Sequence, residues 1–212
     1  MENYEQLIPT KLYTSHKTQT TQTDDVTCRL CGKAPESFAH VLVGCSALAQ
    51  NKYLSRHNAA LKTLFFEMLK VMKLANTVTP WHSCKVPEPL YESAETQAFW
   101  DVPVYAEYNQ VKANRADAQF VDYKSKKVMA VEMRCPWINN RATKDEEKTL
   151  KYVPLRWELK QQFPGYRVEQ YNVIIDVLGG WSRDLDTTMR KMLGPRGRDV
   201  LLRMHRAVIS RT

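Results

Sequence analysis

Three cysteines and one histidine fall close together near the start of the chain, in the pattern Cys28-x2-Cys31-x8-His40-x4-Cys45. A structural zinc ion takes four nitrogen or sulfur ligands in a tetrahedron, and a Cys-x2-Cys turn followed by a His and a Cys on a short helix supplies them. Gly32 suits the tight knuckle that such a pair makes. The alternative is a helix with buried free thiols, because free cysteine often acts as a small hydrophobe. The spacing favours a zinc knuckle, whose metal would order residues 26–50.

The N-terminal residues, the apolar runs and the other cysteines indicate in which cellular compartment the protein is expected. The first residues form neither a basic nor an apolar leader, and no window approaches 18 consecutive apolar residues. We therefore expect a chain that neither spans a membrane nor is secreted through a cleaved signal. Five cysteines without an export signal argue against disulfides, and Cys84 and Cys135 have no partner at ligand spacing.

Hydrophobic patterning predicts an α/β (α+β) fold preceded by a small helical zinc module. With 212 residues, 43% of them hydrophobic, the chain can bury one good core and a small second module. The expected segments are a polar flexible tether (1–25), the zinc knuckle with its following helix (26–75), a proline-containing linker (76–98) and a main domain (99–212). Within that domain we expect strands at 102–108, 118–123, 128–133 and 171–178, a long helix at 144–162, and two basic helices at 182–193 and 198–209.

Two acidic residues flank the predicted hairpin of the main domain. If the chain turns near Lys124, Asp117 and Glu132 fall opposite each other on paired strands and can share a hard cation such as Mg²⁺. Such an ion activates water for attack on a phosphodiester. Lys148 and Tyr152 lie four residues apart on the next predicted helix, and hence on one face. Acids near strand ends are more commonly plain surface residues, so spacing alone leaves both interpretations open.

The charge of the chain is strongly basic. Lys and Arg number 31 against 23 Asp and Glu, a formal net charge of +8. Residues 181–212 alone hold eight basic against three acidic residues, or +5. This favours a polyanionic partner, although a solvated basic face without a ligand is equally compatible. In the last helix Leu201, Met204 and Val208 would pack inward. The residues expected to point outward, as possible phosphate contacts, are Arg196, Arg203 and Arg206.

Taken in order, these motifs resemble the C-terminal region of non-LTR retrotransposon polyproteins of the restriction-like endonuclease class, over roughly residues 26–212. The knuckle Cys28, Cys31, His40 and Cys45 is similar to the Cys-Cys-His-Cys element that precedes the nuclease in that family. The further similar segments are Cys45–Asn58 after the knuckle, Trp100–Val104, Asn114–Asp117 in place of an Arg/Lys-Pro-Asp motif, Glu132, Lys148-x3-Tyr152 and Val173–Gly180.

The resemblance implies a restriction-endonuclease-like fold, with a mixed central sheet flanked by helices. It also implies an enzyme that nicks target DNA in the nucleus to prime reverse transcription. It implies that Asp117 and Glu132 bind the catalytic Mg²⁺, that Lys148 orients water or stabilises the transition state, and that Tyr152 supports the site. Arg115 and Arg134 are expected to contact phosphates. The chain departs from the family at Ala116, which stands in place of proline.

The chain contains no paired-aspartate polymerase motif, so a reverse transcriptase, normally part of the same polyprotein, is an expected partner. The expected nucleic-acid partners are target DNA and, as an alternative, element RNA. One alternative is a catalytically inactive, retrotransposon-derived zinc nucleic-acid-binding remnant, motivated by Ala116 and by the missing polymerase. Another is a protein-binding zinc module, which would leave the two acids unexplained.

Overall fold

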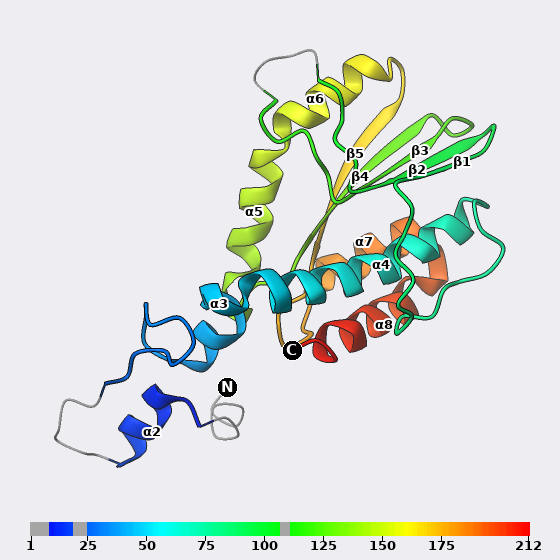
Figure 1. Cartoon of the computed structure of the whole chain (residues 1–212). Coiled ribbons are helices and arrows are strands. Elements are labelled where there is room, and N and C mark those ends of the chain that lie inside the picture. The colour runs from blue at the N-terminus through cyan, green and yellow to red at the C-terminus, as the bar shows by residue number, and fades with distance from the viewer. Residues whose placement is uncertain (1–8, 19–24, 107–110) are drawn as a thin grey trace. The chain divides into compact units, whose positions relative to one another are not determined.

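A computed structural model describes residues 9–18, 25–106 and 111–212 of the chain. The chain divides between Ser55 and Arg56 into two compact units. The first contains the cysteine cluster and the second contains the β-sheet (Figure 1).

The first unit is built from short elements. They are α2 (Lys11–Thr18), an isolated bridge between Thr27 and Pro35, η1 (His40–Gly44), α3 (Ser46–Leu48) and η2 (Ala49–Tyr53). The prediction of an unstructured tether is wrong for α2, while residues 1–8 and 19–24 lie outside the described part. The helix is anchored because the buried Glu36 carboxylate accepts from the backbone N–H of Lys11 at 3.1 Å. Arg29 holds the same carboxylate and lowers the pKa of Glu36 to about 2.

The second unit contains a five-stranded mixed sheet of order β1-β2-β3-β4-β5. Its strands are β1 (Leu90–Glu92), β2 (Thr96–Trp100), β3 (Ala118–Asp122), β4 (Lys127–Arg134) and β5 (Arg167–Ile174). The first four pair antiparallel, and β5 pairs parallel to β4. The chain is therefore of the mixed α/β class, as its patterning predicts.

The central hairpin is the predicted one. β3 and β4 pair from Ala118 opposite Val131 to Asp122 opposite Lys127. The turn between them ends at Lys126, whose φ of 50° is left-handed. Both strands are buried on both faces, as the neighbouring residues Phe120 and Val121 show for β3 and Val128 and Met129 for β4. A strand covered on both sides in this way needs a helical layer on each face of the sheet.

Helices supply these two layers (Figure 1). One layer, α5 (Arg141–Lys151) and α6 (Val153–Gln162), follows η3 (Ile138–Asn140) and makes the crossover from β4 to β5. The other contains α4 (Leu54–Val71), α7 (Arg183–Leu193), η4 (Gly194–Arg196) and α8 (Gly197–Ile209). Phe65 of α4 packs on Phe120 and Trp100 with ring centroids 5.4 and 5.1 Å apart. Leu155 and Leu159 of α6 pack with Val121 and Val128 on the opposite face.

Three boundaries differ from the predicted ones. The segment 76–98 is no simple linker, since it contributes β1 and the start of β2, where Thr96 and Ala98 point inward. The predicted strand 102–108 is only a bridge between Pro103 and Arg115, with residues 107–110 outside the described part. The helix that follows the knuckle, expected in the zinc module, belongs mostly to the unit that holds the sheet.

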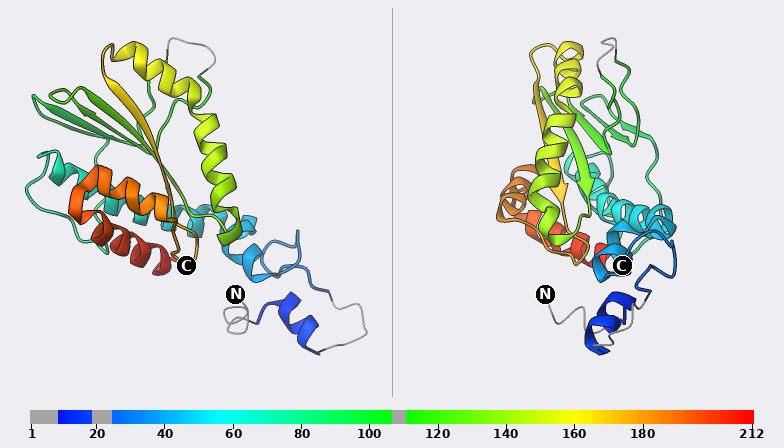
Figure 2. Two further views of the ribbon diagram at one scale, coloured as in Figure 1. Left: turned by 180° about the vertical axis from the view of Figure 1, so that it is seen from behind. Right: turned by 90° about the vertical axis from the view of Figure 1, so that its left-hand side faces the viewer.

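The predicted long helix at 144–162 is two helices. They meet at Tyr152, whose φ of −98° and ψ of 11° depart from helical values, and Pro154 stands in the first turn of α6. Proline lacks the N–H that a continuous helix needs, so the hydrogen bonding of α5 cannot continue through residue 154. Figure 2 shows the resulting change of direction between α5 and α6.

Among the helices that the structure describes, none is both long and apolar enough to cross a lipid bilayer.

Candidate functional sites

The predicted zinc ligands of the first unit come together. One ligand atom from each of Cys28, Cys31, His40 and Cys45 lies within 4.8 Å of all the others. The two buried sulfurs, of Cys28 and Cys45, are 4.0 Å apart, and Cys31 Sγ lies 3.2 Å from Nε2 of His40. In a tetrahedron with Zn–S bonds of about 2.3 Å, ligand sulfurs are about 3.8 Å apart. The cluster therefore can hold a metal ion such as zinc.

The local backbone is shaped for such an ion. Gly32 takes a φ of 64° directly after the second ligand, and its N–H donates to the carbonyl of Cys28 at 2.9 Å. The backbone N–H of Lys33 points at the Cys31 sulfur and lowers the pKa of that thiol. Burial instead raises the pKa of Cys45. A knuckle that directs N–H groups at sulfur favours the thiolate form, which is the form that binds metal.

The predicted acidic pair of the second unit lies at one end of the sheet. The register of the β3–β4 hairpin places Asp117, directly before β3, opposite Glu132. Glu132 Oε1 accepts from the backbone N–H of Asp117 at 3.3 Å, and Asp117 Oδ2 accepts from the backbone N–H of Met133 at 2.7 Å. Each carboxylate is thus bonded to the backbone of the other strand, and the two charges are held side by side.

Helix α5 brings the predicted lysine to the same place. Lys148 Nζ lies 2.5 Å from Glu132 Oε2, with both side chains almost fully buried. The ammonium group is also 4.9 Å from the ring centroid of Tyr152. The Tyr152 hydroxyl donates to the carbonyl of Arg115 at 3.2 Å, which fixes the loop before Asp117. The four residues singled out from the sequence therefore converge on one location.

A fifth member of this group has no counterpart in the prediction. His57, near the start of α4 and 8% exposed, places Nε2 3.1 Å from Asp117 Oδ2. Its other ring nitrogen, Nδ1, lies 2.9 Å from Oδ1 of Asn58. Sequence spacing offers no signal for this contact, because His57 and Asp117 are 60 residues apart and α4 is read naturally as a packing helix.

The ionisable groups of the site shift one another. Burial, together with the adjacent Asp117 charge, raises the pKa of Glu132 despite Lys148. Burial lowers the pKa of Lys148, which its ion pair with Glu132 offsets only in part. Burial works to raise the pKa of Asp117, but the hydrogen bond and charge of His57 lower it overall, and the same contact raises the pKa of His57 against its own burial. Opposed shifts on neighbouring carboxylates are typical of functional sites.

Ala116, which stands where the resembled Arg/Lys-Pro-Asp motif has a proline, packs tightly. The side chain is 3% exposed and belongs to the cluster around Val121 and Tyr152. Asp117 is held by Met133, His57 and Glu132, so its position does not depend on a proline before it.

Two of the predicted phosphate-binding arginines lie beside this group. Arg134 ends β4, two residues after Glu132, and its charge is close enough to affect the pKa values of His57 and Lys148. The Arg115 side chain is 55% exposed and pairs with Asp101 at 2.6 Å. Arg134 therefore places positive charge beside the acidic pair, whereas the Arg115 side chain is bound to Asp101.

The three arginines that were expected to point outward near the C-terminus do not all do so. Arg203 does not point outward as expected, because it donates to the buried carboxylate of Glu67 on α4, and Arg196 lies 3.3 Å from the same carboxylate. A fully buried carboxylate needs such partners, so both arginines have a structural role. Arg206 is exposed, and Leu201, Met204 and Val208 are buried as predicted.

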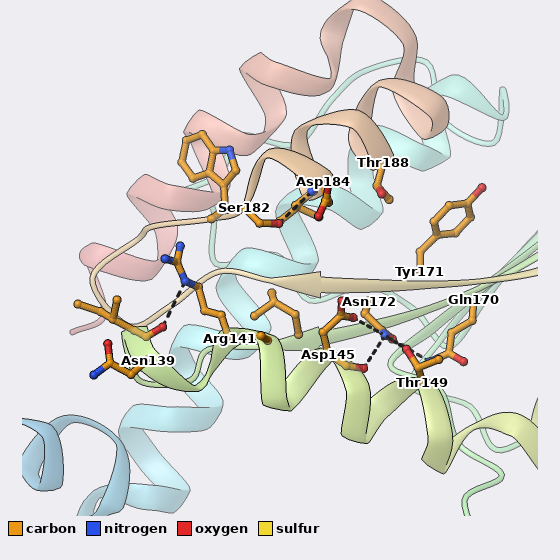
Figure 3. Close-up of a pocket in the computed structure, with 15 residues that line it drawn as sticks. Asn139, Arg141, Asp145, Thr149, Gln170, Tyr171, Asn172, Ser182, Asp184 and Thr188 are labelled. Carbon is orange, nitrogen blue, oxygen red and sulfur yellow. Dashed lines mark hydrogen bonds between the residues drawn. The ribbon is translucent and has the colours of Figure 1, made fainter.

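A separate pocket of about 600 Å³ opens along the free edge of β5, between α5 and the start of α7 (Figure 3). Its polar walls bond to one another, since Asn172 donates to Asp145 at 2.7 Å and to Thr149 at 2.8 Å. Gln170 donates at 3.1 Å to the backbone carbonyl of Lys148, so the pocket wall supports the helix that carries the lysine.

A scan against models of protein families and a search of curated proteins both found no match to this chain.

Proposed function

We propose that this chain is a metal-dependent DNA endonuclease region of a non-LTR retrotransposon of the restriction-like class, acting in the nucleus with a reverse transcriptase. The observation that carries the proposal is the convergence of Asp117, Glu132 and Lys148 at one end of a buried hairpin. The mixed sheet with helices on both faces is compatible with a restriction-endonuclease-like fold.

In this proposal the residues divide the chemistry among themselves. Asp117 and Glu132 would hold Mg²⁺, which supplies an activated water and neutralises charge on the phosphate. Lys148, already 2.5 Å from Glu132, orients that water or stabilises the charge that develops on the scissile phosphate. Tyr152 positions the loop before Asp117 through its bond to Arg115. Arg134 and Arg115 would bind flanking phosphates.

The zinc knuckle contributes the second part of the proposed function. A metal bound by Cys28, Cys31, His40 and Cys45 would order a small unit with several basic residues. That unit precedes the nuclease region in the sequence and would bind nucleic acid. Its contacts are expected to be mainly to phosphates, so binding would weaken steeply with salt.

The experiment is a supercoiled-plasmid nicking assay with the zinc-loaded full chain and Mg²⁺. Wild type is expected to convert supercoiled to open-circular DNA, and Glu132→Ala to lose this by a factor of at least about 100. Glu147→Ala, an exposed acid on α5, is the matched control and should nick normally. Failure of the wild type to nick, or undiminished nicking by Glu132→Ala, would reject the proposal.

A second candidate is a nucleic-acid-binding remnant without nuclease activity. The observation in its favour is that the Lys148 ammonium group occupies one oxygen of Glu132 that a cation would need. It predicts DNA or RNA binding with a steep salt dependence and no cleavage in Mg²⁺ or Mn²⁺.

A further inference from the structure

The position of His57 carries a chemical consequence for the acidic site. Its side chain is almost fully buried on α4, and its Nε2 faces a carboxylate oxygen of Asp117 at 3.1 Å. The apolar stripe of α4 needs no imidazole here, because Ala60, Leu61 and Leu64 supply the buried surface of the following turns.

The contact with Asn58 bears on which ring nitrogen of His57 carries the proton. The Oδ1 oxygen of Asn58 can only accept, so the Nδ1 that lies 2.9 Å away must carry a proton. The neutral imidazole then has its lone pair on Nε2, directed at Asp117. Metal-binding histidines usually donate one ring N–H to an oxygen and bind the metal through the other ring nitrogen.

The distance between the two facing atoms suits a shared cation. Adjacent ligands in an octahedron with bonds of about 2.1 Å are about 3.0 Å apart, and Nε2 and Oδ2 are separated by 3.1 Å. Asp117 Oδ2 also accepts from the backbone N–H of Met133 at 2.7 Å, which fixes the oxygen toward the imidazole. Glu132 lies next to Asp117, because its Oε1 accepts from the backbone N–H of Asp117 at 3.3 Å and its pKa is raised in part by the Asp117 charge.

We propose that His57 is a third protein ligand, through Nε2, of the divalent ion that Asp117 and Glu132 hold. This inference rests on the metal site of the proposed function. A nitrogen ligand shifts preference from Mg²⁺, which favours oxygen, toward Mn²⁺, Fe²⁺ or Co²⁺. The site would therefore be a mixed imidazole and carboxylate site, with Lys148 and Arg134 keeping its affinity modest through their charge.

The probe is Mn²⁺ added to the full chain after one equivalent of Zn²⁺ has filled the knuckle. Pulsed electron paramagnetic resonance detects the ¹⁴N coupling that an imidazole ligand gives to bound Mn²⁺. We expect this coupling in the wild type, and its loss in His57→Gln together with an affinity for Mn²⁺ lower by at least about tenfold. His82→Gln, an exposed histidine in the same unit, is the control and should leave the signal unchanged.

The outcomes separate the two proposals. Nicking with bound Mn²⁺ but no ¹⁴N coupling, or coupling that persists in a folded His57→Gln, would overturn the histidine ligand and leave the endonuclease intact. A wild type that neither binds Mn²⁺ nor nicks DNA would overturn both. His57→Glu provides a second variant, because exchanging nitrogen for oxygen should raise the ratio of Mg²⁺-supported to Mn²⁺-supported nicking; an unchanged ratio would count against the ligand.

Discussion

Arg203 on α8 and Glu67 on α4 form a short ion pair across 136 residues of sequence, and the Glu67 side chain has no exposed surface. Arg196 approaches the same carboxylate at 3.3 Å. Part of the basic charge near the C-terminus therefore pairs with a buried acid, and this ion pair links α4 and α8, which cover one face of the sheet.

Truncating this buried acid should destabilise the sheet unit. Glu67→Ala leaves Arg203 and Arg196, whose side chains are 25% and 45% exposed, without their shared carboxylate, and we expect it to lower the free energy of unfolding by about 1–3 kcal/mol. The measurement is equilibrium unfolding in urea. Glu147→Ala removes an exposed pair with Lys144 on α5 and is the control, with an expected cost below about 1 kcal/mol. Equal effects of the two variants would contradict a structural role for Glu67.

Nucleic-acid binding should distinguish Arg206 from Arg203. Arg206 is exposed, so if it contacts a phosphate, Arg206→Ala lowers the slope of log affinity against log salt by about 0.9. Arg203→Ala should lower the unfolding midpoint and leave that slope unchanged where the protein is folded. Salt titrations of DNA binding by fluorescence anisotropy test both statements, and an unchanged slope for Arg206→Ala would remove it from the interface.

Thiol reactivity should fall into three classes among the five free cysteines. In the zinc-loaded native protein only the exposed Cys84 should react with Ellman's reagent. A chelator should release three more thiols, those of Cys28, Cys31 and Cys45. Cys135 should react only after unfolding, because burial raises its pKa to about 12 and blocks the reagent. Stepwise counts other than one, four and five would contradict the zinc cluster or the burial of Cys135.

The ion pair of the candidate site should cost stability. Burial raises the pKa of Glu132 and lowers that of Lys148, so at neutral pH both charged forms are disfavoured by the fold. Replacing both, in Glu132→Gln with Lys148→Met, should keep or raise stability by about 1–4 kcal/mol while abolishing nicking. Thermal unfolding measures the first effect and the plasmid assay the second. Lys148→Met alone leaves a buried carboxylate and should be less stable than the double variant.

The contact between His57 and Asp117 should stabilise the protein only over a limited pH range. The folded pKa of His57 is raised, so its contribution is full below the ordinary value of 6.5 and is lost as pH rises through the folded value. The folded pKa of Asp117 is lowered, so its contribution to stability is full above the ordinary value of 3.8 and is lost as pH falls through the folded value. The stability difference between wild type and His57→Gln, without added divalent ions, should be larger at pH 5 than at pH 8.5. A difference that is the same at both values would contradict the ion pair.

Local patterns predicted the parts of the molecule that depend on local spacing. The zinc ligands lie within one short segment, and Asp117 and Glu132 are joined by a single hairpin whose turn fixes their register. The position of Lys148 near these acids could be predicted because the next helix, α5, lies in the crossover that leads from β4 to β5.

The remaining features depend on packing between distant segments. Whether Arg203 points outward is decided by Glu67 on another helix, and His57 reaches Asp117 only because α4 packs against the sheet. The helix break at Pro154 was visible in the sequence, but the apolar periodicity that continues across it favoured one helix. β1 and the start of β2 were missed because the prolines around them suggested a linker.

The distances along the chain within the candidate site have a consequence for how the protein acquires it. Asp117 and Glu132 are 15 residues apart and Lys148 follows after 16 more, whereas His57 comes from 60 residues upstream. Short loops close at lower entropic cost, so the hairpin can form while its acids are still hydrated. The imidazole can reach Asp117 only once α4 has docked on the sheet. Folding of the core and assembly of the site would thus be completed in the same event.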